Sequence, residues 1–371
     1  MRVQIVDPPA YTPPYDRSLC AALARAGADV ELVTSRFAHG PVPAAEGYRV
    51  SESFYRRSAR AGSQTGRRRA LKLAEHVGDM LRYRRDGGRA DVVHYQWLTL
   101  PGLDSRLLPA ARPRVLTAHG WLREEAWQDR PGRALRRLWD QMDAIVTLSE
   151  HGAIRLREQA GIPADRVRVI PHGAFDYLTR IPDPVPLPDD LAAVDGPVIL
   201  CFGLIRPYKG VDLLLEAFRS VEGAELWVVG RPLGVSIDSL RELASRAPGR
   251  VRFVPRFVSD RELPAYFQRA DLVVLPHRDA EQSGVLYVAL AFANPIVMSA
   301  VGGFREVAAH GAGRLVPAGD REALAAALND LLTDADARER LAVAARRAAA
   351  GPYSWDTVAE QTLGLYRDLV G

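Results

Sequence analysis

Residues 198–210 read VILCFGLIRPYKG, an apolar run followed by a loop with two glycines. Of the 49 basic side chains in the chain only two are lysines, and one of them, Lys209, lies in this loop. A lysine presents a compact, strongly hydrated point charge, which can suit a phosphate better than a planar guanidinium. Phosphates bind preferentially beyond the carboxyl ends of strands and at helix N-termini. The stretch therefore predicts a phosphate site in an α/β domain; a lysine that merely decorates a surface loop is the alternative.

Short apolar runs alternate with helical stretches on both sides of this loop. In the first half the expected strands are residues 3–7, 30–34, 91–95, 114–118, 144–148 and 167–170, with helices over 15–26, 67–85 and 133–142. In the second half the expected strands are residues 198–202, 225–229, 251–253, 272–275, 296–299 and 313–316. Such alternation is typical of a parallel sheet covered by helices on both faces.

The prolines of residues 181–190 indicate a linker between two such patterns. We therefore predict an α/β fold of two Rossmann-like domains, whose parallel sheets face each other across a cleft. The first domain spans residues 1–175, the linker 176–196 and the second domain 197–350. Residues 351–371 are the C-terminal helical segment.

Composition narrows the class of protein. The chain has 371 residues, 47% of them hydrophobic and 25% charged, which is typical of a soluble globular protein. Its apolar start is too short for a secretory signal. Residues 282–304 carry no charge, but Pro295 and two adjacent glycines favour a helix, a turn and a buried strand over a membrane span. Cys20 and Cys201 lie in separate apolar segments and are expected to be buried free thiols. These features predict a cytoplasmic location.

The charge is unevenly distributed. Residues 1–180 carry 29 basic and 20 acidic groups, whereas the remainder carries 20 and 25. The excess is concentrated in residues 49–89, where arginines occur in pairs and triplets. A basic surface can attract anionic lipid, nucleic acid or an acidic substrate, or can be a solvated face in an arginine-rich chain. No nucleic-acid-binding motif accompanies it, so we expect no nucleic acid partner and consider a peripheral contact with the inner face of a membrane. The oligomeric state stays open.

Four segments together resemble a known family. They are residues 143–150 (DAIVTLSE), 169–173 (VIPHG), 203–218 (GLIRPYKGVDLLLEAF) and 284–307 (GVLYVALAFANPIVMSAVGGFREV). Their order and sequences resemble the retaining nucleotide-sugar glycosyltransferases of family 4, which have the GT-B architecture, and the resemblance covers nearly the whole chain. It also implies that a last helix, residues 355–369, returns to pack on the first domain.

The resemblance implies transfer of a sugar from a nucleoside diphosphate sugar to an acceptor hydroxyl, with retention of configuration. The departing diphosphate must be stabilised as its bond to the sugar breaks. Gly203, Arg206 and Lys209 would bind the donor, and the two cations would neutralise the diphosphate without a metal or another cofactor. The family usually has an arginine directly after the glycine; here Leu204 occupies that place, and Arg206 is expected to substitute for it.

A second donor element precedes an apolar helix. Ser283, Gly284 and Val285 would present unpaired amides to a phosphate. Glu281 matches the first carboxylate of the family's glutamate pair, which would contact the donor sugar; a solvated acid in the loop is the alternative. The second glutamate is missing, because position 289 is Ala289, or Val288 when counted back from Pro295, so contacts to the ribose must come from elsewhere.

The loop after the first strand, residues 8–16, reads PPAYTPPYD. Because proline offers no amide donor, we expect this loop to shape an acceptor pocket and not to bind phosphate. The expected acceptor residues are Tyr11, Thr12, Tyr15 and Asp16.

Three histidines follow predicted strands. His119 matches the family's first-domain histidine, and the resemblance implies that it hydrogen-bonds the transferred sugar or the acceptor. With Arg206, Lys209 and Glu281 it completes the expected catalytic set. His94 is expected to line the cleft wall, and His172 to cap the crossover between the domains.

Asp334 and Asp336 are similar to the metal-binding pair of the other main glycosyltransferase architecture. They precede a helical stretch over residues 337–350, so we expect Asp334 to cap that helix and expect activity without added metal. The family's retention implies front-face attack, in which the leaving phosphate takes the acceptor proton. A nucleotide-sugar epimerase of the same fold and a noncatalytic nucleotide-sugar-binding subunit stay open. A dehydrogenase is disfavoured because no Gly-x-Gly-x-x-Gly loop follows either first strand.

Overall fold

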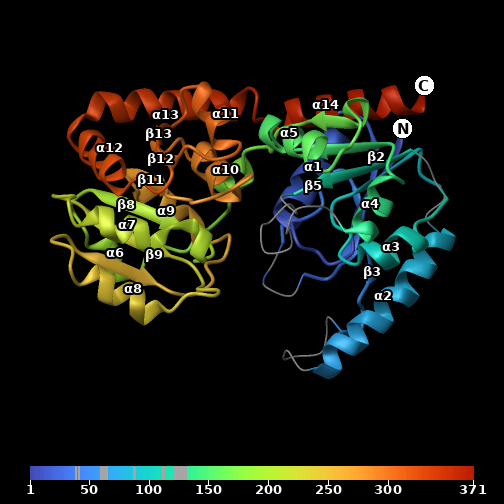
Figure 1. Ribbon diagram of the computed structural model, residues 1–371, viewed down its shortest axis with the longest axis horizontal. Helices are drawn as coiled ribbons and strands as arrows, with labels where there is room; N and C mark the ends of the chain where they lie inside the picture. The colour runs from blue at the N-terminus through green and yellow to red at the C-terminus, as the bar shows by residue number, and fades with distance from the viewer. Residues whose placement is uncertain (38–39, 41, 59–65, 87–88, 111–112, 120–131) are drawn as a thin grey trace. The chain divides into compact units, whose positions relative to one another are not determined.

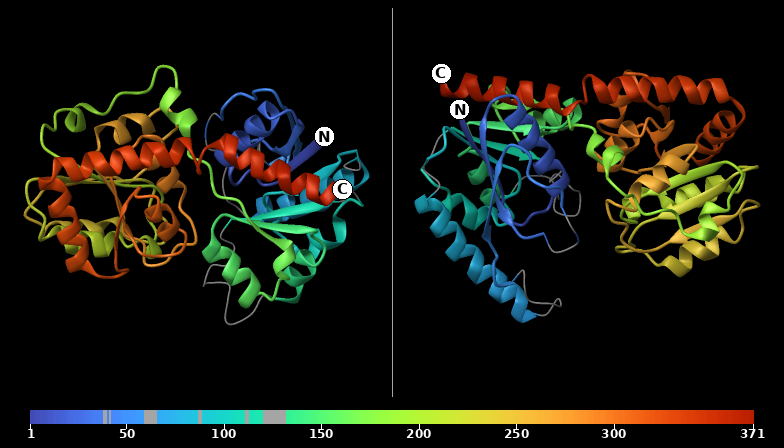
Figure 2. Two further views of the ribbon diagram at one scale, coloured as in Figure 1. Left: turned by 90° about the horizontal axis from the view of Figure 1, so that it is seen from above. Right: turned by 180° about the vertical axis from the view of Figure 1, so that it is seen from behind.

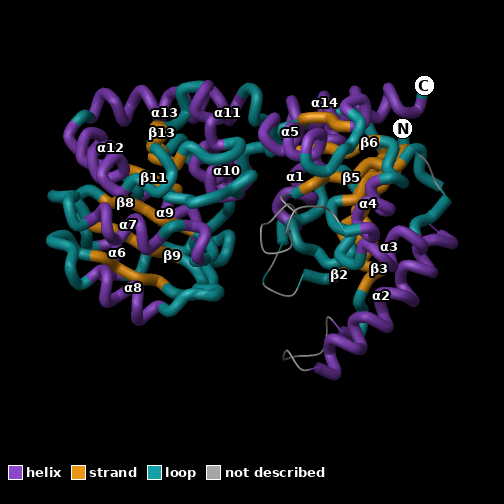
Figure 3. The backbone as a smooth tube through the Cα atoms, viewed as in Figure 1, coloured by secondary structure: helices purple, strands orange, loops and turns teal. Residues whose placement is uncertain are grey.

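The computed structural model describes residues 1–37, 40, 42–58, 66–86, 89–110, 113–119 and 132–371. They form two compact units. Unit 1 consists of Met1–Gly173 and Trp355–Gly371, and unit 2 of Ala174–Ser354 (Figure 1). Each unit is a parallel sheet flanked by helices, as the tube view in Figure 3 shows.

Unit 1 contains a seven-stranded sheet in the order β3-β2-β1-β4-β5-β6-β7. Its strands are β1 (Arg2–Asp7), β2 (Asp29–Ser35), β3 (Arg49–Phe54), β4 (Val92–Tyr95), β5 (Arg114–Ala118), β6 (Ala144–Thr147) and β7 (Val167–Val169). Its helices are α1 (Pro13–Arg25), α2 (Gly66–Asp86), α3 (Pro101–Leu107), α4 (Arg133–Trp139), α5 (Glu150–Glu158), the 3₁₀ turn η3 (Ala164–Arg166) and α14 (Trp355–Val370).

The central strands form where the sequence is mostly apolar. Every residue of β4 is buried, and β1 buries four of its last five residues. Strands covered on both faces need such runs. β3 was not predicted, and the structure corrects this: its sequence RVSESF alternates polar residues, which an edge strand tolerates because one side and much of one face stay solvated.

The last helix, α14, belongs to unit 1 and packs along α1 (Figure 2). Arg25 and Asp356 form an ion pair at 2.6 Å. Tyr366 shares a hydrogen bond of 2.6 Å with Nδ1 of His94, whose Nε2 lies 2.6 Å from the Thr117 hydroxyl. His94 is 1% exposed, and burial lowers its pKa to about 3. The expectation that His94 lines a cleft is therefore wrong: as a neutral core residue it connects β4, β5 and α14.

Unit 2 contains a six-stranded sheet in the order β10-β9-β8-β11-β12-β13. Its strands are β8 (Val198–Phe202), β9 (Glu225–Val229), β10 (Val251–Val254), β11 (Leu272–Leu275), β12 (Ile296–Ser299) and β13 (Arg314–Val316). Its helices are η4 (Asp176–Arg180), α6 (Asp189–Ala192), η5 (Pro207–Lys209), α7 (Val211–Phe218), α8 (Ile237–Ala244), α9 (Leu263–Arg269), α10 (Gly284–Ala291), α11 (Phe304–Ala309), α12 (Arg321–Thr333) and α13 (Ala335–Ala350).

The charge-free segment of residues 282–304 is a helix, a turn and a strand, as predicted. It contains α10 and β12, and β12 is buried throughout. Among the helices that the structure describes, none is long and apolar enough to cross a bilayer. Asp334 caps α13, because its carboxylate accepts a hydrogen bond from the Ala337 amide at 2.8 Å, which confirms the prediction. Cys20 and Cys201 are buried free thiols, also as predicted.

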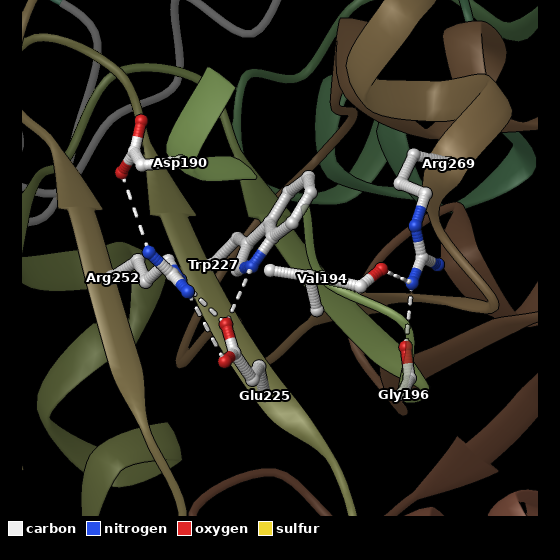
Figure 4. A network of polar contacts seen from close by, with 7 residues as sticks. All are labelled: Asp190, Val194, Gly196, Glu225, Trp227, Arg252 and Arg269. Atoms are coloured by element: carbon white, nitrogen blue, oxygen red, sulfur yellow. Dashed lines mark hydrogen bonds and ion pairs between the residues drawn. The ribbon is translucent and has the colours of Figure 1, made fainter. Parts of the chain in front are cut away.

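The segment that leads into β8 is bound to unit 2 by charged side chains (Figure 4). Arg252 of β10 bonds Glu225 of β9 at 2.6 Å and Asp190 of α6 at 3.3 Å. Arg269 donates to the carbonyl oxygens of Val194 and Gly196, both at 2.6 Å. The proline-rich linker predicted over residues 176–196 therefore contains η4 and α6 and ends in fixed contacts with the sheet.

Both sheets reverse their strand order at one point. In unit 1 this point lies between β1 and β4, and in unit 2 between β8 and β11. In open α/β sheets, ligands bind in the crevice beyond the carboxyl ends of the strands at such a switch point. The candidate sites are therefore the loops that follow β1 and β4 and the loops that follow β8 and β11.

Candidate active site

A tight loop follows β8 and carries Gly203, Arg206 and Lys209. Gly203 has φ 106° and Gly210 has φ 67°, in the left-handed region that favours glycine. A Cβ atom on Gly210 would lie 2.1 Å from the carbonyl oxygen of Pro276. The loop after β8 therefore packs directly on the loop after β11, at the switch point of the unit 2 sheet.

Lys209 is the last residue of the 3₁₀ turn η5, and Arg206 directly precedes that turn. The Lys209 amide donates to the Arg206 carbonyl at 3.0 Å. The Lys209 ammonium is 3.3 Å from the position of a Cβ on Gly203, so it lies beside the end of β8. Nε of Arg206 is buried and has no hydrogen-bond partner in the described part of the chain. A buried donor without an acceptor costs free energy, and a phosphate oxygen would satisfy it.

The first turn of α10 lies against the same loop. A methyl group of Val285 is 2.9 Å from the Cβ position of Gly203. Ser283 precedes the helix in an extended conformation, but its hydroxyl makes no capping bond. That hydroxyl is buried and finds no partner among the residues that the structure describes. The Leu286 amide donates to the Ser283 carbonyl at 3.0 Å, so the first turn offers the amides of Gly284 and Val285 to an anion beside Lys209.

Glu281 is half-buried in the loop before α10. Its carbonyl oxygen accepts a hydrogen bond from the Gly303 amide at 3.2 Å, which joins this loop to the turn after β12. Ala289 is fully buried in α10, and Val288 is 6% exposed. The helix sequence GVLYVALA contains no acid, so Glu281 has no second carboxylate from α10 beside it.

His277 was not predicted as a site residue, and the structure places it beside Lys209. It is 2% exposed, and its ring meets those of Tyr208 and Phe304 edge to face. Burial lowers the pKa of His277 well below its usual value, and the charge of Lys209 lowers it further. His277 is therefore a neutral imidazole. The signal that could have found it is its position one residue beyond Pro276, at the end of an apolar run.

The loop after β1 is held by two buried acids. The carboxylate of Asp7 accepts a hydrogen bond from the Thr12 amide at 3.3 Å. The Thr12 hydroxyl donates to Asp16 at 3.3 Å and accepts from the Trp97 indole at 2.9 Å. Asp16, predicted as an acceptor residue, is 1% exposed. The structure thus places Asp16 under the loop, where it holds Thr12 in position.

The two acids perturb each other. Burial raises the pKa of Asp7 to about 6, whereas the hydrogen bonds from Asp16 and from backbone amides of the loop lower it. Burial raises the pKa of Asp16 well above its usual value, and the charge and hydrogen bond of Asp7 raise it further. Two carboxyl groups this close share a proton. Burial of both carboxyl groups, and the charge of Asp7 beside Asp16, therefore favour protonation of the pair.

His119 directly follows β5 and is surrounded by polar and aromatic groups. Its Nε2–H donates to Oε1 of Gln96 at 2.7 Å. The Trp97 indole stacks on the imidazole, with ring centroids 5.4 Å apart and 15° between the planes, and Tyr15 meets it edge-on at 4.6 Å. Burial lowers the pKa of His119 well below its usual value, and nearby His172 adds to the effect. His119 is therefore a neutral hydrogen-bonding group.

Gln96 and Trp97 are further residues that were not predicted. They follow β4 directly, at the switch point of the unit 1 sheet. Trp97 also meets Tyr11 edge-on at 5.4 Å, and Tyr11 is 58% exposed. His172 bonds the Gly173 carbonyl through Nδ1 at 2.7 Å, within its own segment.

The structure brings the predicted residues together in two groups, one in each unit. The unit 1 group is Tyr11, Thr12, Tyr15, Asp16 and His119; the unit 2 group is Gly203, Arg206, Lys209, Glu281, Ser283, Gly284 and Val285.

Two family models match the chain. The model described as Glycosyltransferase Family 4 matches residues 17–174, and that described as Glycosyl transferases group 1 matches residues 196–334. A D-inositol 3-phosphate glycosyltransferase of Xylanimonas cellulosilytica is 31% identical, over 95% of this chain and 90% of that protein. A GDP-mannose-dependent alpha-(1-6)-phosphatidylinositol monomannoside mannosyltransferase of Mycolicibacterium smegmatis is 30% identical, over 67% of this chain and 68% of that protein.

Solved structures share the fold. A sucrose-phosphate synthase from Thermosynechococcus elongatus has a TM-score of 0.76 and 21% identity, over 99% of this chain and 98% of that one. HepE of Anabaena in complex with UDP-glucose has a TM-score of 0.73 and 19% identity, over the whole of both chains. These likenesses confirm the predicted GT-B architecture of two Rossmann-like domains.

Proposed function

The chain belongs to glycosyltransferase family 4, and we propose that it transfers a sugar from a nucleoside diphosphate sugar to an acceptor hydroxyl, with retention of configuration and without a divalent metal. One observation carries this proposal. The Lys209 ammonium and Val285 in the first turn of α10 both lie beside Gly203, and Arg206 begins the same turn as Lys209; Arg206 and Ser283 leave buried polar atoms unpaired among the described residues.

The diphosphate would bind between the loop after β8 and the first turn of α10. Phosphate oxygens would accept from Nε of Arg206, from Ser283 and from the amides of the first turn of α10, with Lys209 as a nearby point charge. When the bond between the sugar and the phosphate breaks, negative charge collects on the leaving oxygen. Two fixed cations and a helix N-terminus stabilise that charge without a metal, and His277, being neutral, adds no competing charge.

The acceptor would bind in unit 1. His119 is neutral and held by Gln96, so it can exchange hydrogen bonds with a sugar or acceptor hydroxyl without losing a proton to it. Tyr11, Thr12 and Trp97 form the edge of the same site. No side chain is needed as a nucleophile, because the leaving phosphate oxygen can accept the acceptor proton on the face that it departs from. This front-face route gives retention.

The alternatives are less well supported. The epimerase and the noncatalytic subunit are not favoured, because the curated relatives named above are transferases. The GDP-mannose of one relative and the UDP-glucose of one solved complex do not fix the donor base of this chain. The proposal therefore covers the reaction class and leaves the base and the sugar open.

We also propose a peripheral contact with anionic membranes through α2 and its surroundings. Leu71, Leu73 and Leu81 are exposed by 39%, 51% and 50%, on a helix that also exposes Arg82 and Arg84. Figure 1 shows the N-terminal part of α2 extending away from the rest of unit 1. Exposed leucines beside arginines are typical of surfaces that lie on acidic lipid headgroups.

Product analysis tests the proposed reaction. The protein is treated with chelator, given a panel of nucleoside diphosphate sugars with an acceptor, and the products are examined by proton nuclear magnetic resonance. The proposal predicts a glycoside with the anomeric configuration of the donor, formed at the same rate with and without chelator. An inverted anomeric centre, a free epimerised nucleotide sugar or a strict need for magnesium would contradict it.

A further inference from the structure

A cavity of about 440 Å³ lies in unit 1 beyond the carboxyl ends of β4 and β5. Ligand sites for small organic molecules typically have volumes of about 300–1,000 Å³. Its walls come from the segment after β4, from β5 and from α4 with the residues beside it. The side chains that form most of them are Trp97, Leu98, Leu116, Leu135, Leu138 and Trp139.

The walls are apolar and partly flat. The indole ring of Trp97 and the phenol of Tyr11 contribute aromatic surface, with the fully buried Trp139 behind them. None of the cavity-lining residues within the described ranges carries a charge. A phosphate group would require a cation or several amide donors, whereas aromatic faces and leucines favour a flat apolar ring.

Gln96 brings a buried amide to the wall of this cavity. Gln96 lines it and is 1% exposed, and Nε2 of its amide has no hydrogen-bond acceptor among the residues described. Its other amide atom, Oε1, is occupied by His119. A buried amide N–H without an acceptor costs free energy, and a ligand oxygen would remove that cost. The Gln96 amide is thus a hydrogen-bond donor in a wall that also contains the hydroxyls of Thr99 and Thr117.

The cavity adjoins the group predicted to bind the acceptor. Trp97 forms one wall and stacks on His119 with its indole ring, and Gln96 bonds that same imidazole. Tyr11, at the rim, packs edge-on against Trp97. A ligand that fills the cavity and bonds Gln96 therefore has its oxygen close to the imidazole that would position a reacting hydroxyl.

We propose that the acceptor is a neutral alcohol carried on a flat apolar ring system, and that this ring binds in the cavity between Trp97, Leu98 and Leu135. An oxygen of the acceptor accepts from Nε2 of Gln96, while His119 bonds the hydroxyl to be glycosylated. The inference rests on the proposed glycosyltransferase function and adds the chemical class of the acceptor. It separates this chain from relatives whose names specify an inositol phosphate or a phosphatidylinositol acceptor.

Binding of 2-naphthol to the full chain tests the inference without turnover. Titration calorimetry would compare wild type, Leu98→Ser and Leu135→Ser, from two different walls, with Leu107→Ser as the matched control. Leu107 packs on the same core and is also partly buried, but it is not among the residues lining the cavity. Thermal unfolding of each variant checks that it is folded, and two variants on separate walls prevent one misfolded protein from deciding the result.

The expected result is saturable binding of 2-naphthol to wild type and to Leu107→Ser. In each of the other two variants the dissociation constant rises about tenfold, because a leucine contact is lost. Decanol and myo-inositol 1-phosphate bind more weakly than 2-naphthol. The inference is overturned if 2-naphthol does not bind, if its affinity is equal in all four proteins, if the control loses as much, or if decanol or the inositol phosphate binds more tightly.

A parallel titration with uridine and guanosine diphosphates separates this inference from the proposed function. If a nucleotide binds wild type and not Lys209→Ala while 2-naphthol fails, the acceptor inference is wrong and the transferase proposal stands. If 2-naphthol binds and no nucleotide does, the proposed function fails, and the ring cannot be assigned to an acceptor.

Discussion

His119 donates a hydrogen bond from Nε2 to Oε1 of Gln96, at 2.7 Å. The amide oxygen can only accept, so the proton is on Nε2, and Nδ1 is left as the acceptor atom of a neutral ring. Gln96 thereby fixes both the tautomer and the orientation of the imidazole that we assign to substrate binding.

Replacing the His119 imidazole should lower activity and should leave the shape of the pH–rate profile unchanged between pH 6 and 8. We expect His119→Ala to reduce kcat/KM about 10- to 100-fold, the loss of a hydrogen bond of about 1–3 kcal/mol. The wild-type rate should not follow an imidazole titration between pH 6 and 8, because the pKa of His119 is well below that range. Gln96→Leu should also lower kcat, by a smaller factor than His119→Ala does. A bell-shaped profile lost only in His119→Ala would show that His119 titrates and would contradict this account.

The acid pair below the β1 loop predicts a specific dependence of stability on pH. The folded-state pKa of Asp7, about 6, is above its ordinary value of 3.8. Folding therefore favours the protonated form, so Asp7 costs stability as pH rises from about 4 to above 6, by up to about 3 kcal/mol. Asp7→Asn should remove this cost: relative to wild type, it should become more stable as the pH rises.

Urea unfolding at pH 5 and pH 7.5 measures this difference. Subtracting the free energy of unfolding of Asp7→Asn from that of wild type cancels the contribution of the buried histidines. That contribution changes with pH in the opposite direction. Asp29→Asn serves as control, because Asp29 is a partly exposed acid of the same unit that pairs with Arg49. If this difference in the free energy of unfolding is the same at both pH values, the Asp7 carboxyl group does not titrate as described.

Two serines that precede helices of unit 2 should respond differently to substitution. Ser236 accepts a hydrogen bond from the Ser239 amide at 3.3 Å and caps α8, whereas Ser283 caps nothing. Ser236→Ala should therefore lose about 0.5–2 kcal/mol of stability and keep its nucleotide affinity. Ser283→Ala should keep its stability and weaken binding of the nucleoside diphosphate about tenfold, a loss of about 1.4 kcal/mol. The opposite assignment of effects would remove Ser283 from the donor site.

The membrane proposal predicts binding to vesicles that depends on lipid charge. Sedimentation with vesicles of phosphatidylglycerol and phosphatidylcholine should retain the wild type at low salt, and less of it at high salt. Substituting Leu71, Leu73 and Leu81 with serine should abolish most of this binding. A variant with serine at Leu233 and Val343, which are exposed to a similar degree in unit 2, serves as control. Equal retention of both variants would contradict a contact through α2.

The fold was predictable because buried parallel strands need continuous apolar runs. All of the predicted strands are present, and β3 was missed because its polar sequence only fits an edge. The α10 segment was read correctly from Pro295 and the two glycines after it, which exclude a single long helix. The predicted cleft wall at His94 failed because a histidine at the end of a strand can just as well be held in the core, here by Tyr366 and Thr117.

The site was predictable where its signal is local in sequence. A few adjacent residues were enough to identify the turn that carries Arg206 and Lys209. The same holds for the start of α10. Gln96 and His277 become site residues only through the strand order, which places β4 beside β1 and β11 beside β8. Asp16 was expected to contact the acceptor, but its burial under Thr12 follows from packing of the β1 loop, which no short motif encodes.

Thermal unfolding with uridine, guanosine, adenosine and thymidine diphosphates tests the donor site most directly, in wild type, Lys209→Ala and Lys72→Ala. Lys72 is the only other lysine of the chain and lies in α2 of unit 1, so it is the matched control. A nucleotide at about one hundred times its dissociation constant adds about 2.7 kcal/mol of stability. The account predicts that one diphosphate raises the midpoint of wild type and of Lys72→Ala but not of Lys209→Ala. If no diphosphate raises the wild-type midpoint, or if Lys209→Ala responds as wild type does, then the loop at Lys209 is not the donor site.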